Sequence, residues 1–346
     1  MNPARILVIR RDNIGDLVCT TPLLSALRQH FPSARIEALV NSYNAPVLRG
    51  NPSVDALHVY RKAKHRAPGE SKIAIWWQTT RLMLRLRQEN FDTVILATPA
   101  KQTTALDFAR WVRPRQIIAY GSHAEGIDAP IPLAEANLGH ETEAVMRLLR
   151  PFGLEETPGP VCVYADAAAA GRIALPAAAD ANSPIIGLHI SSRKPSQRWP
   201  AEKFAELARR LAAHHGARLL LFWSPGSELH PLHPGDDEKA RQIMALCGDM
   251  PLLPLPTYRL DALIAGLSRC DRIICSDGGA MHLAAGLGKP IVCFFGDSNP
   301  VRWHPWGVPY ELLQPARLNV SDISVDAALA AYEQLEMRLA APRQTH

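Results

Sequence analysis

A twice-repeated alternation of short apolar runs and amphipathic stretches constrains the fold of this 346-residue chain more than any other feature. In the first series, strands are expected at 6–9, 36–40, 56–59, 93–97 and 116–120, and helices at 16–30, 79–89, 101–112 and 140–149. In the second series, strands are expected at 184–190, 219–223, 272–275 and 291–295, and helices at 201–214, 237–245, 260–267, 280–286 and 325–339. Strands that alternate with helices predict parallel sheets joined by right-handed crossovers.

The two series are separated by a proline- and alanine-rich stretch at 151–183. A chain of this length is also expected to contain about two domains. We therefore expect an N-terminal domain at 1–165, a linker at 166–183, a second domain at 184–322, and a C-terminal helical segment at 323–346 that could pack back on the N-terminal domain. The expected fold class is α/β, with two Rossmann-like doubly wound domains that face each other across a cleft.

Composition narrows the class of protein. Hydrophobic residues make up 47% and charged residues 21% of the chain, an ordinary globular balance that supports two cores. No run reaches the roughly 18–20 apolar residues that cross a bilayer, and the apolar stretch at 6–9 is too short for a secretory signal, so we expect a cytoplasmic protein. The six cysteines form no C-x-x-C pair and are expected to be buried free thiols.

In open α/β sheets, ligands bind beyond the carboxyl ends of the strands, where loops enter helices whose first N–H groups attract anions. Neither the dinucleotide fingerprint G-x-G-x-x-G nor the phosphate loop G-x-x-x-x-G-K-[ST] occurs in the chain. A dehydrogenase and an ATPase are therefore disfavoured.

The first strand-to-helix loop ends in Gly15-Asp16. A carboxylate at the start of a helix gains about 0.3–1 kcal/mol from the helix dipole and satisfies free N–H groups, so Asp16 is interpretable as a helix cap. It is also a candidate for proton-transfer chemistry. The two roles are compatible.

A second candidate loop follows the strand expected at 272–275 and contains Asp277, Gly278, Gly279 and, one turn later, His282. Two glycines at a helix N-terminus let the backbone approach a ligand closely, which suits a diphosphate. The neighbouring loop at 295–300 is expected on the same side. The alternative is ordinary turn chemistry with a structural histidine.

A third loop, at 189–200, combines three cations with three hydroxyl groups; its candidate ligands are Ser191, Ser192, Lys194 and Arg198. This inventory can hold phosphate oxygens without a metal, and the D-x-D pair of metal-dependent sugar transferases is absent from the sequence. A solvated basic turn is the alternative.

Together these motifs resemble those of glycosyltransferase family 9, the ADP-heptose:lipopolysaccharide heptosyltransferases. The N-terminal motif is matched by Gly15-Asp16 and Thr21-Pro22. The C-terminal motif is matched by Asp277, Gly279, His282 and the segment 283–290. The resemblance spans nearly the whole chain and implies the two-domain glycosyltransferase-B fold.

The resemblance also implies roles for individual residues. Asp16 corresponds to the proposed catalytic base of the family. The expected donor contacts are Ser191, Ser192, Lys194, Arg198, Glu238, Asp277, Gly278, Gly279 and His282, and Glu228 and Asp237 stay open beside Glu238 as the acidic contact. Two positions depart from the family pattern, because Gly278 replaces a Thr or Ser and Gln197 replaces a Lys.

The implied reaction is an inverting, metal-independent transfer of heptose, or of a related sugar, from ADP-heptose to a lipopolysaccharide inner-core acceptor, without a cofactor. The basic run at 61–66, with Arg61, Lys64 and Arg66, is the expected acceptor contact and could hold the enzyme at the cytoplasmic face of the inner membrane. A solvated loop is the alternative for this run.

Two other functions remain open at this stage: a sugar-nucleotide epimerase of similar fold and a non-catalytic nucleotide-sugar-binding protein. Nucleic-acid binding has only the net charge of +5 in its favour. The sugar, the nucleotide base, the acceptor hydroxyl and the oligomeric state do not follow from the sequence.

Overall fold

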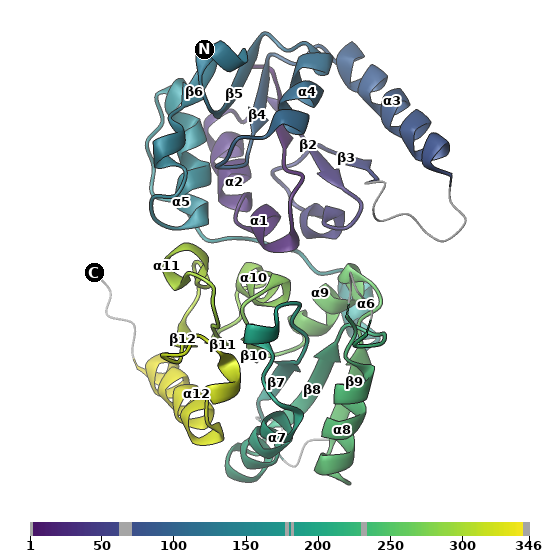
Figure 1. The fold of residues 1–346 in the computed structure, drawn as a ribbon, viewed down its shortest axis with the longest axis vertical. Coiled ribbons are helices and arrows are strands. Elements are labelled where there is room, and N and C mark those ends of the chain that lie inside the picture. The colour runs from purple at the N-terminus through teal and green to yellow at the C-terminus, as the bar shows by residue number, and fades with distance from the viewer. Residues whose placement is uncertain (1–2, 62–70, 177–179, 181–182, 230–233, 342–346) are drawn as a thin grey trace. The chain divides into compact units, whose positions relative to one another are not determined.

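The computed structural model describes residues 3–61, 71–176, 180, 183–229 and 234–341. The chain divides into two compact units, Met1–Tyr164 and Ala165–His346. Each unit contains one six-stranded sheet in which every strand pairs in parallel (Figure 1). The expected α/β class is therefore confirmed.

In the first unit the strand order is β3-β2-β1-β4-β5-β6. The strands are β1 (Arg5–Ile9), β2 (Arg35–Asn41), β3 (Ala56–Tyr60), β4 (Thr93–Leu96), β5 (Gln116–Tyr120) and β6 (Ala129–Ile131). The helices are α1 (Ile14–Val18), α2 (Thr21–His30), α3 (Lys72–Gln88), α4 (Thr103–Val112) and α5 (Glu141–Met146). All five expected strands are present, but the stretch expected as one helix at 16–30 is interrupted at 19–20, where α2 begins with Pro22 in its first turn.

The second unit repeats this topology with the order β12-β11-β10-β7-β8-β9. Its strands are β7 (Ile185–His189), β8 (Arg218–Trp223), β9 (Leu252–Pro256), β10 (Arg272–Ser276), β11 (Ile291–Phe294) and β12 (Tyr310–Leu313). Its helices are α6 (Ala167–Gly171), α7 (Ala201–His215), α8 (Asp237–Cys247), α9 (Leu260–Ser268), α10 (Gly279–Gly286), α11 (Pro300–Trp303) and α12 (Val325–Ala340).

Two segments differ from expectation: the linker expected at 166–183, and the C-terminal segment that was expected to be able to pack on the N-terminal domain. The stretch expected as a linker contains α6, which contacts α9 of the second unit. The C-terminal helix α12 starts at an N-cap in which the Ser324 hydroxyl accepts from the Ala327 amide, and it packs on α7 and β12. Buried Tyr332 and Leu335 join α12 to the core of the second unit.

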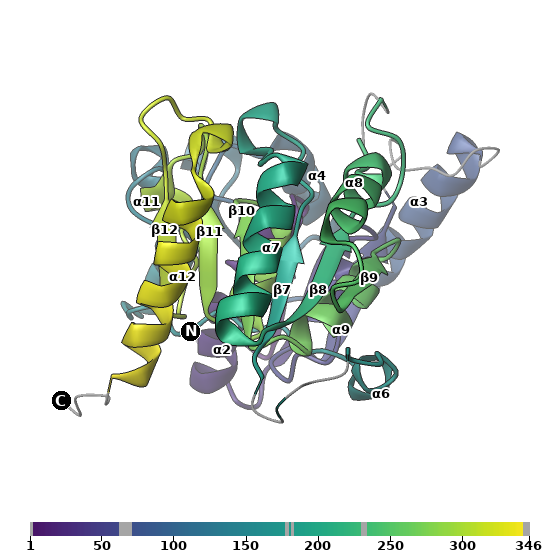
Figure 2. The same cartoon turned by 90° about the horizontal axis from the view of Figure 1, so that it is seen from below.

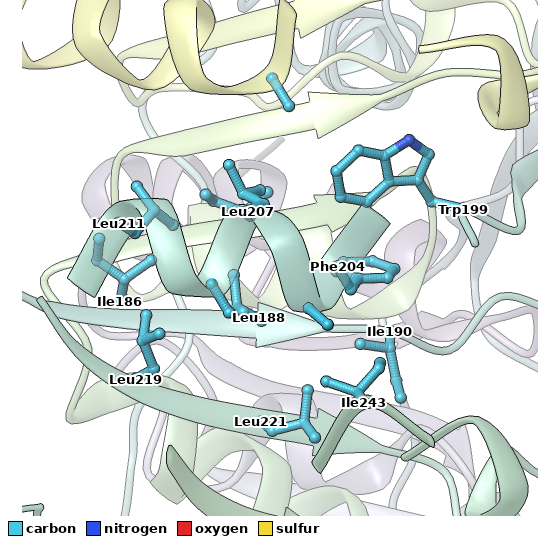
Figure 3. Close-up of a cluster of buried hydrophobic side chains, with 14 of the residues drawn as sticks. Ile186, Leu188, Ile190, Trp199, Phe204, Leu207, Leu211, Leu219, Leu221 and Ile243 are labelled. Atoms are coloured by element: carbon cyan, nitrogen blue, oxygen red, sulfur yellow. The ribbon is translucent and has the colours of Figure 1, made fainter. Parts of the chain in front are cut away.

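The core of the second unit lies between the sheet and the helices α7, α8 and α12, which cover one face of that sheet (Figure 2). Figure 3 shows Leu207 and Leu211 of α7 above Ile186 and Leu188 of β7. At the start of α7, Trp199 is 1% exposed, packs edge-to-face on Phe204 at 4.8 Å between ring centroids, and donates its indole N–H to the Ile323 carbonyl at 3.0 Å. This side chain therefore joins the sheet, α7 and the segment that leads into α12.

Two further expectations concern buried free cysteines and the absence of a membrane-spanning segment. All six cysteines are free; five are buried, and Cys162 is the exception because it is partly exposed. No helix among the described residues combines the length and the apolar character that crossing a bilayer requires.

Both sheets reverse their winding direction beside their first strand, between β1 and β4 in the first unit and between β7 and β10 in the second. The carboxyl ends of two neighbouring strands splay their following loops apart at such a point, which creates a binding crevice. The loops after β1, β4, β7 and β10 are therefore where the functional groups are sought.

Replacing Trp199 tests the packing of the second unit. We expect Trp199→Ala to lower the free energy of unfolding by about 3–5 kcal/mol, because it removes a large buried ring and leaves a cavity. Trp199→Phe should cost less, since it retains a ring and loses mainly the hydrogen bond, which is worth about 1 kcal/mol. Urea denaturation followed by circular dichroism measures both; equal losses for the two variants would contradict the packing role.

Candidate active site

A buried arginine organises the switch point of the first sheet. Arg10 follows β1 directly and is 1% exposed. Its Nη2 atom lies 2.9 Å from Asp16 Oδ1 and 2.6 Å from Glu141 Oε1, and its Nε atom lies 3.2 Å from Asp12 Oδ2. Its Nη1 atom donates to the Ala97 carbonyl at the end of β4. One guanidinium thus holds three carboxylates, which come from the loop after β1, from α1 and from α5.

Asp16 lies in the third position of α1 and is held from two sides. Oδ1 accepts from Arg10, and Oδ2 accepts from the Asn13 amide at 2.9 Å, so the cap predicted from the sequence is present. Burial alone would raise the pKa of Asp16, but the Arg10 charge and the bonds from Asn13 outweigh it, so the pKa lies below its ordinary value of 3.8. Asp16 is consequently an oriented carboxylate that is ionised at neutral pH, and its side chain is 14% exposed.

Arg10 and Glu141 are parts of this arrangement that the sequence analysis missed. Glu141 is the first residue of α5 and its side chain is 3% exposed. Burial and the three carboxylates have opposite effects on the pKa of Arg10, and the carboxylates prevail, so the pKa is raised. Arg10 and Glu141 are separated by 131 positions in the chain, and no local sequence pattern connects residues that far apart.

In the second unit, Gln197 connects the loops that follow β7, β10 and β11. Its Nε2 atom donates to Asp277 Oδ2 at 2.9 Å and to Ser298 Oγ at 2.5 Å, and its Oε1 atom accepts from Ser192 Oγ at 3.3 Å. Gln197 is 4% exposed. The side chain that replaces the family's Lys therefore positions Asp277 instead of presenting a charge.

Lys194 lies in a separate pair at the outer side of the same loop. Its Nζ atom is 3.3 Å from Asp297 Oδ1, which also accepts from Ser196 Oγ at 2.8 Å. The two loops touch closely, because a Cβ at Gly296 would lie 2.4 Å from the Ser196 carbonyl oxygen. Gly296 is required for this approach.

The loop after β10 leads into α10, whose first turn contains Gly279 and His282. His282 is 5% exposed and packs edge-to-face against Trp303 of α11 at 5.9 Å between ring centroids. A Cβ at the N-cap, Gly278, would meet no atom of the described chain within 4 Å. The space beside Gly278 at this helix N-terminus is therefore open, and the first amides of a helix favour an anion.

A buried acidic residue, Asp236, lies between the loops that follow β7 and β8. It is 1% exposed, and within the described chain neither carboxylate oxygen makes a hydrogen bond of good geometry, although the Ser191 hydroxyl is close enough to interact with it. Burial raises its pKa, against the weaker lowering effects of Ser191, Lys239 and Arg198 nearby. Burial also lowers the pKa of Lys239 to about 8, and Lys239 Nζ donates to the Ile190 carbonyl at 2.9 Å.

The other acidic candidates lie elsewhere. Asp237 caps its own loop by accepting from Trp223 Nε1 at 2.7 Å and from the Gly226 amide at 2.9 Å. The expected donor contact Glu238 instead pairs with Arg241 at the surface of α8, with its side chain 67% exposed, and Glu228 is exposed. The structure therefore does not bring Glu238 to the group formed by Ser191, Arg198 and Asp236.

A pair of glycines closes the loop that precedes Asp236. A Cβ at Gly235 would lie 2.2 Å from the Gly226 carbonyl carbon, so only glycine fits there. The Gly235 amide donates to the Ser227 carbonyl and the Asp236 amide to the Ser224 carbonyl, both at 2.9 Å. The Ser224 amide in turn donates to Ser191 Oγ at 2.8 Å. The base of this loop thus fixes Asp236 beside Ser191.

The residues expected to contact the acceptor are described only in part. Arg61 follows β3 and is exposed. Lys64 and Arg66 lie outside the described residues.

The comparison with protein families agrees with the motifs. The model of glycosyltransferase family 9 (heptosyltransferase) matches residues 79–321, which is more than half of the chain. The chain belongs to glycosyltransferase family 9. It is therefore a glycosyltransferase, as the resemblance implied. Asp16 precedes the matched segment, so its assignment depends on the geometry of the Arg10 network and on the N-terminal motif.

Relatives of known name are lipopolysaccharide heptosyltransferases. Lipopolysaccharide heptosyltransferase 3 of Escherichia coli (strain K12) is 26% identical over 297 residues, covering 84% of this chain and 82% of that protein. Lipopolysaccharide heptosyltransferase 1 of the same strain is 24% identical over 342 residues, covering 96% of this chain and 100% of that protein.

Solved structures confirm the glycosyltransferase-B-like fold. The family 9 glycosyltransferase from Veillonella parvula DSM 2008 matches with a TM-score of 0.80 and 20% identity over 97% of each chain. The E. coli ADP-heptose lipopolysaccharide heptosyltransferase II matches with a TM-score of 0.76 and 18% identity over 97% of this chain and 100% of that one.

Removing Arg10 tests the network. We expect Arg10→Met to destabilise the first unit by about 3–5 kcal/mol at pH 7, because it leaves buried carboxylates without their cation. The loss should shrink at acid pH: the folded pKa of Asp16 lies below 3.8, so its stabilising contribution is present above that value and is lost as the pH falls through the folded pKa. Urea denaturation at pH 7 and pH 3 measures this, with the exposed Arg115→Met as control. A loss equal to that of the control would contradict the network.

Proposed function

We propose that this glycosyltransferase transfers a heptose from ADP-heptose to a lipopolysaccharide inner-core acceptor by an inverting, metal-independent displacement. The observation that carries the proposal is the oriented, ionised carboxylate of Asp16 at the switch point of the first sheet. The names of the relatives supply the sugar and the acceptor class. ADP-heptose is the donor named for one matching structure.

In the proposed reaction Asp16 is the general base. As the acceptor oxygen forms its bond to the anomeric carbon, the hydroxyl proton passes to a carboxylate oxygen of Asp16, and the bond from the anomeric carbon to the diphosphate breaks with its electron pair on the diphosphate oxygen. Arg10 and Asn13 each occupy one acceptor position on the carboxylate and leave lone pairs for the proton. Because the pKa of Asp16 is low, the proton moves late, once bond formation has acidified the hydroxyl.

On the donor side, the proposed contacts of the diphosphate are the amides of α10, His282 and the hydroxyl and basic groups of the loop after β7, with Ser192, Lys194 and Arg198. Asp277 is held by Gln197 and positions this loop. We assign the acidic contact to Asp236 in place of Glu238. Ser191 is the only side chain of the described residues that hydrogen-bonds weakly to this carboxylate, so lone pairs stay open for both hydroxyl groups of a ribose, which would offset the cost of burial.

The acceptor and the cellular location are part of the same proposal. Arg61, and in the sequence Lys64 and Arg66, would contact anionic groups of the acceptor. An enzyme that uses a lipid-linked acceptor and nucleotide-activated sugar acts at the cytoplasmic face of the inner membrane. An epimerase would instead convert its sugar nucleotide without an acceptor, so incubation with donor alone, analysed by NMR, distinguishes the two activities.

Replacing the base tests the mechanism. We expect Asp16→Asn to lower the transfer rate by about 10²–10⁴-fold, the usual contribution of a positioned base, and to leave ADP affinity within a few-fold of wild type. The matched control is Asp107→Asn on α4, whose side chain is 66% exposed. Transfer is followed by mass spectrometry of the acceptor and ADP binding by calorimetry. Wild-type transfer by the Asp16 variant would remove this residue from the base role.

Two variants two positions apart test the donor contact. Asp236→Ala should weaken ADP binding by about 10–100-fold, as expected for the loss of hydrogen bonds to a charged acceptor. Glu238→Ala should leave binding unchanged, because Glu238 pairs only with Arg241 among the contacts described. Calorimetric titration with ADP, and with UDP, GDP and CDP for base preference, gives both answers. Weakening by the Glu238 variant alone would restore the sequence-based assignment.

A further inference from the structure

Helix α3 exposes an aromatic surface that the proposed reaction does not use. Ile73 is 69% exposed, Trp76 60% and Trp77 62%, and the two indole rings lie edge-to-face at 5.2 Å between centroids. Figure 1 shows α3 extending away from the sheet of its own unit. Exposed side chains of this size form an apolar surface of the kind that marks a binding site.

Three of the exposed residues share one side of the helix, and Trp76 lies about 60° from the nearest of them, Ile73. At about 100° per residue, the spacing of Ile73, Trp77 and Leu84 places them within about 40° of one another. The end of α3 anchors it through Met83 and Leu86, which are 4% and 0% exposed in the core cluster of the first unit. Trp77 lies about 180° around the helix from Leu86, so it is not needed to hold α3 in place. Trp76 lies within about 20° of Met83 but two turns before it, where it is 60% exposed.

The charge of α3 has one sign. Its 17 residues include Lys72, Arg81, Arg85 and Arg87 and no Asp or Glu. Arg81 and Arg85 are exposed beside the aromatic stripe. Exposed indoles next to arginines suit the interface of a bilayer, where the rings lie among the headgroups and the cations meet anionic lipids.

We propose that α3 docks this enzyme on a membrane surface that contains anionic lipids, with Trp76 and Trp77 inserted at the headgroup level. The helix lies along the surface instead of crossing it, because its basic residues and its length exclude a span. The biological reason for docking rests on the proposed function, since a lipid-linked acceptor lies in the membrane. The docking itself is measured without any sugar transfer.

Charge complementarity favours a bilayer over a second copy of this chain. A symmetric pair would place the same patch on both partners and bring two uniformly basic helices together. Like charges across an interface oppose association, whereas an anionic lipid surface attracts them.

The test uses the full chain and sedimentation with vesicles of phosphatidylcholine containing or lacking about one third phosphatidylglycerol. Wild type should bind the anionic vesicles, and Trp76→Ala/Trp77→Ala should lower the partition coefficient about tenfold or more through loss of buried apolar area. Trp111→Ala is the matched control, because Trp111 on α4 is 45% exposed and lies outside the stripe. Arg81→Glu/Arg85→Glu should abolish the preference for anionic lipid.

Each outcome bears on the proposal. Equal partition of the double tryptophan variant and wild type, or no binding of wild type to anionic vesicles, overturns it. Sedimentation velocity showing a wild-type dimer that the double variant dissociates, without vesicle binding, assigns the surface to a second copy and also overturns it. Transfer to a delipidated acceptor separates the two proposals: docking variants should keep that activity, whereas Asp16→Asn should lose it and still bind vesicles.

Discussion

The first unit depends on one buried cation. Arg10 ends the central strand β1 and contacts carboxylates from the following loop, from α1 and from α5, as well as a carbonyl at the end of β4. A buried guanidinium is tolerable only when such partners neutralise and hydrogen-bond it, so the segments that supply them must meet at this point. The same requirement fixes the orientation of Asp16. The stability of the first unit and the orientation of Asp16, the proposed base, therefore have a common cause.

In the second unit a neutral side chain, Gln197, has the central position that Arg10 has in the first. Gln197 joins three loops through its amide, and the cations Lys194 and Arg198 lie around it instead of at its centre. The fixed cation orients the carboxylate of Asp16, the proposed base, although it lowers its pKa, whereas the proposed phosphate-binding loop keeps its cations at the periphery. The two sheets share one topology and differ in what occupies the switch point.

Sequence patterns predicted every strand inside the two sheets but only one of the four edge strands, β3. The strands β6, β9 and β12 escaped prediction; all three are edge strands, and β9 contains Pro254 and Pro256, which only an edge tolerates. The first half of α3 escaped because its exposed aromatic residues break the amphipathic period. Loop motifs drew attention to Asp16, Asp277 and His282, which stay predictions as site residues. No local pattern distinguishes the buried N-cap residue Asp236 from Glu238 in the first turn of α8, and Arg10 and Glu141 meet only through the tertiary fold.

The loop between β8 and α8 is closed at its base, where residues 224–227 contact residues 235–236. Gly226 and Gly235 are in contact, and backbone hydrogen bonds connect Ser224 and Ser227 to the residues that enter α8. These contacts fix the positions of both loop ends. A dye attached at exposed Ser227 or Glu228, next to this closed base, would therefore leave the ends of β8 and α8 in register. This makes the loop a natural attachment point for an optical reporter of nucleotide occupancy.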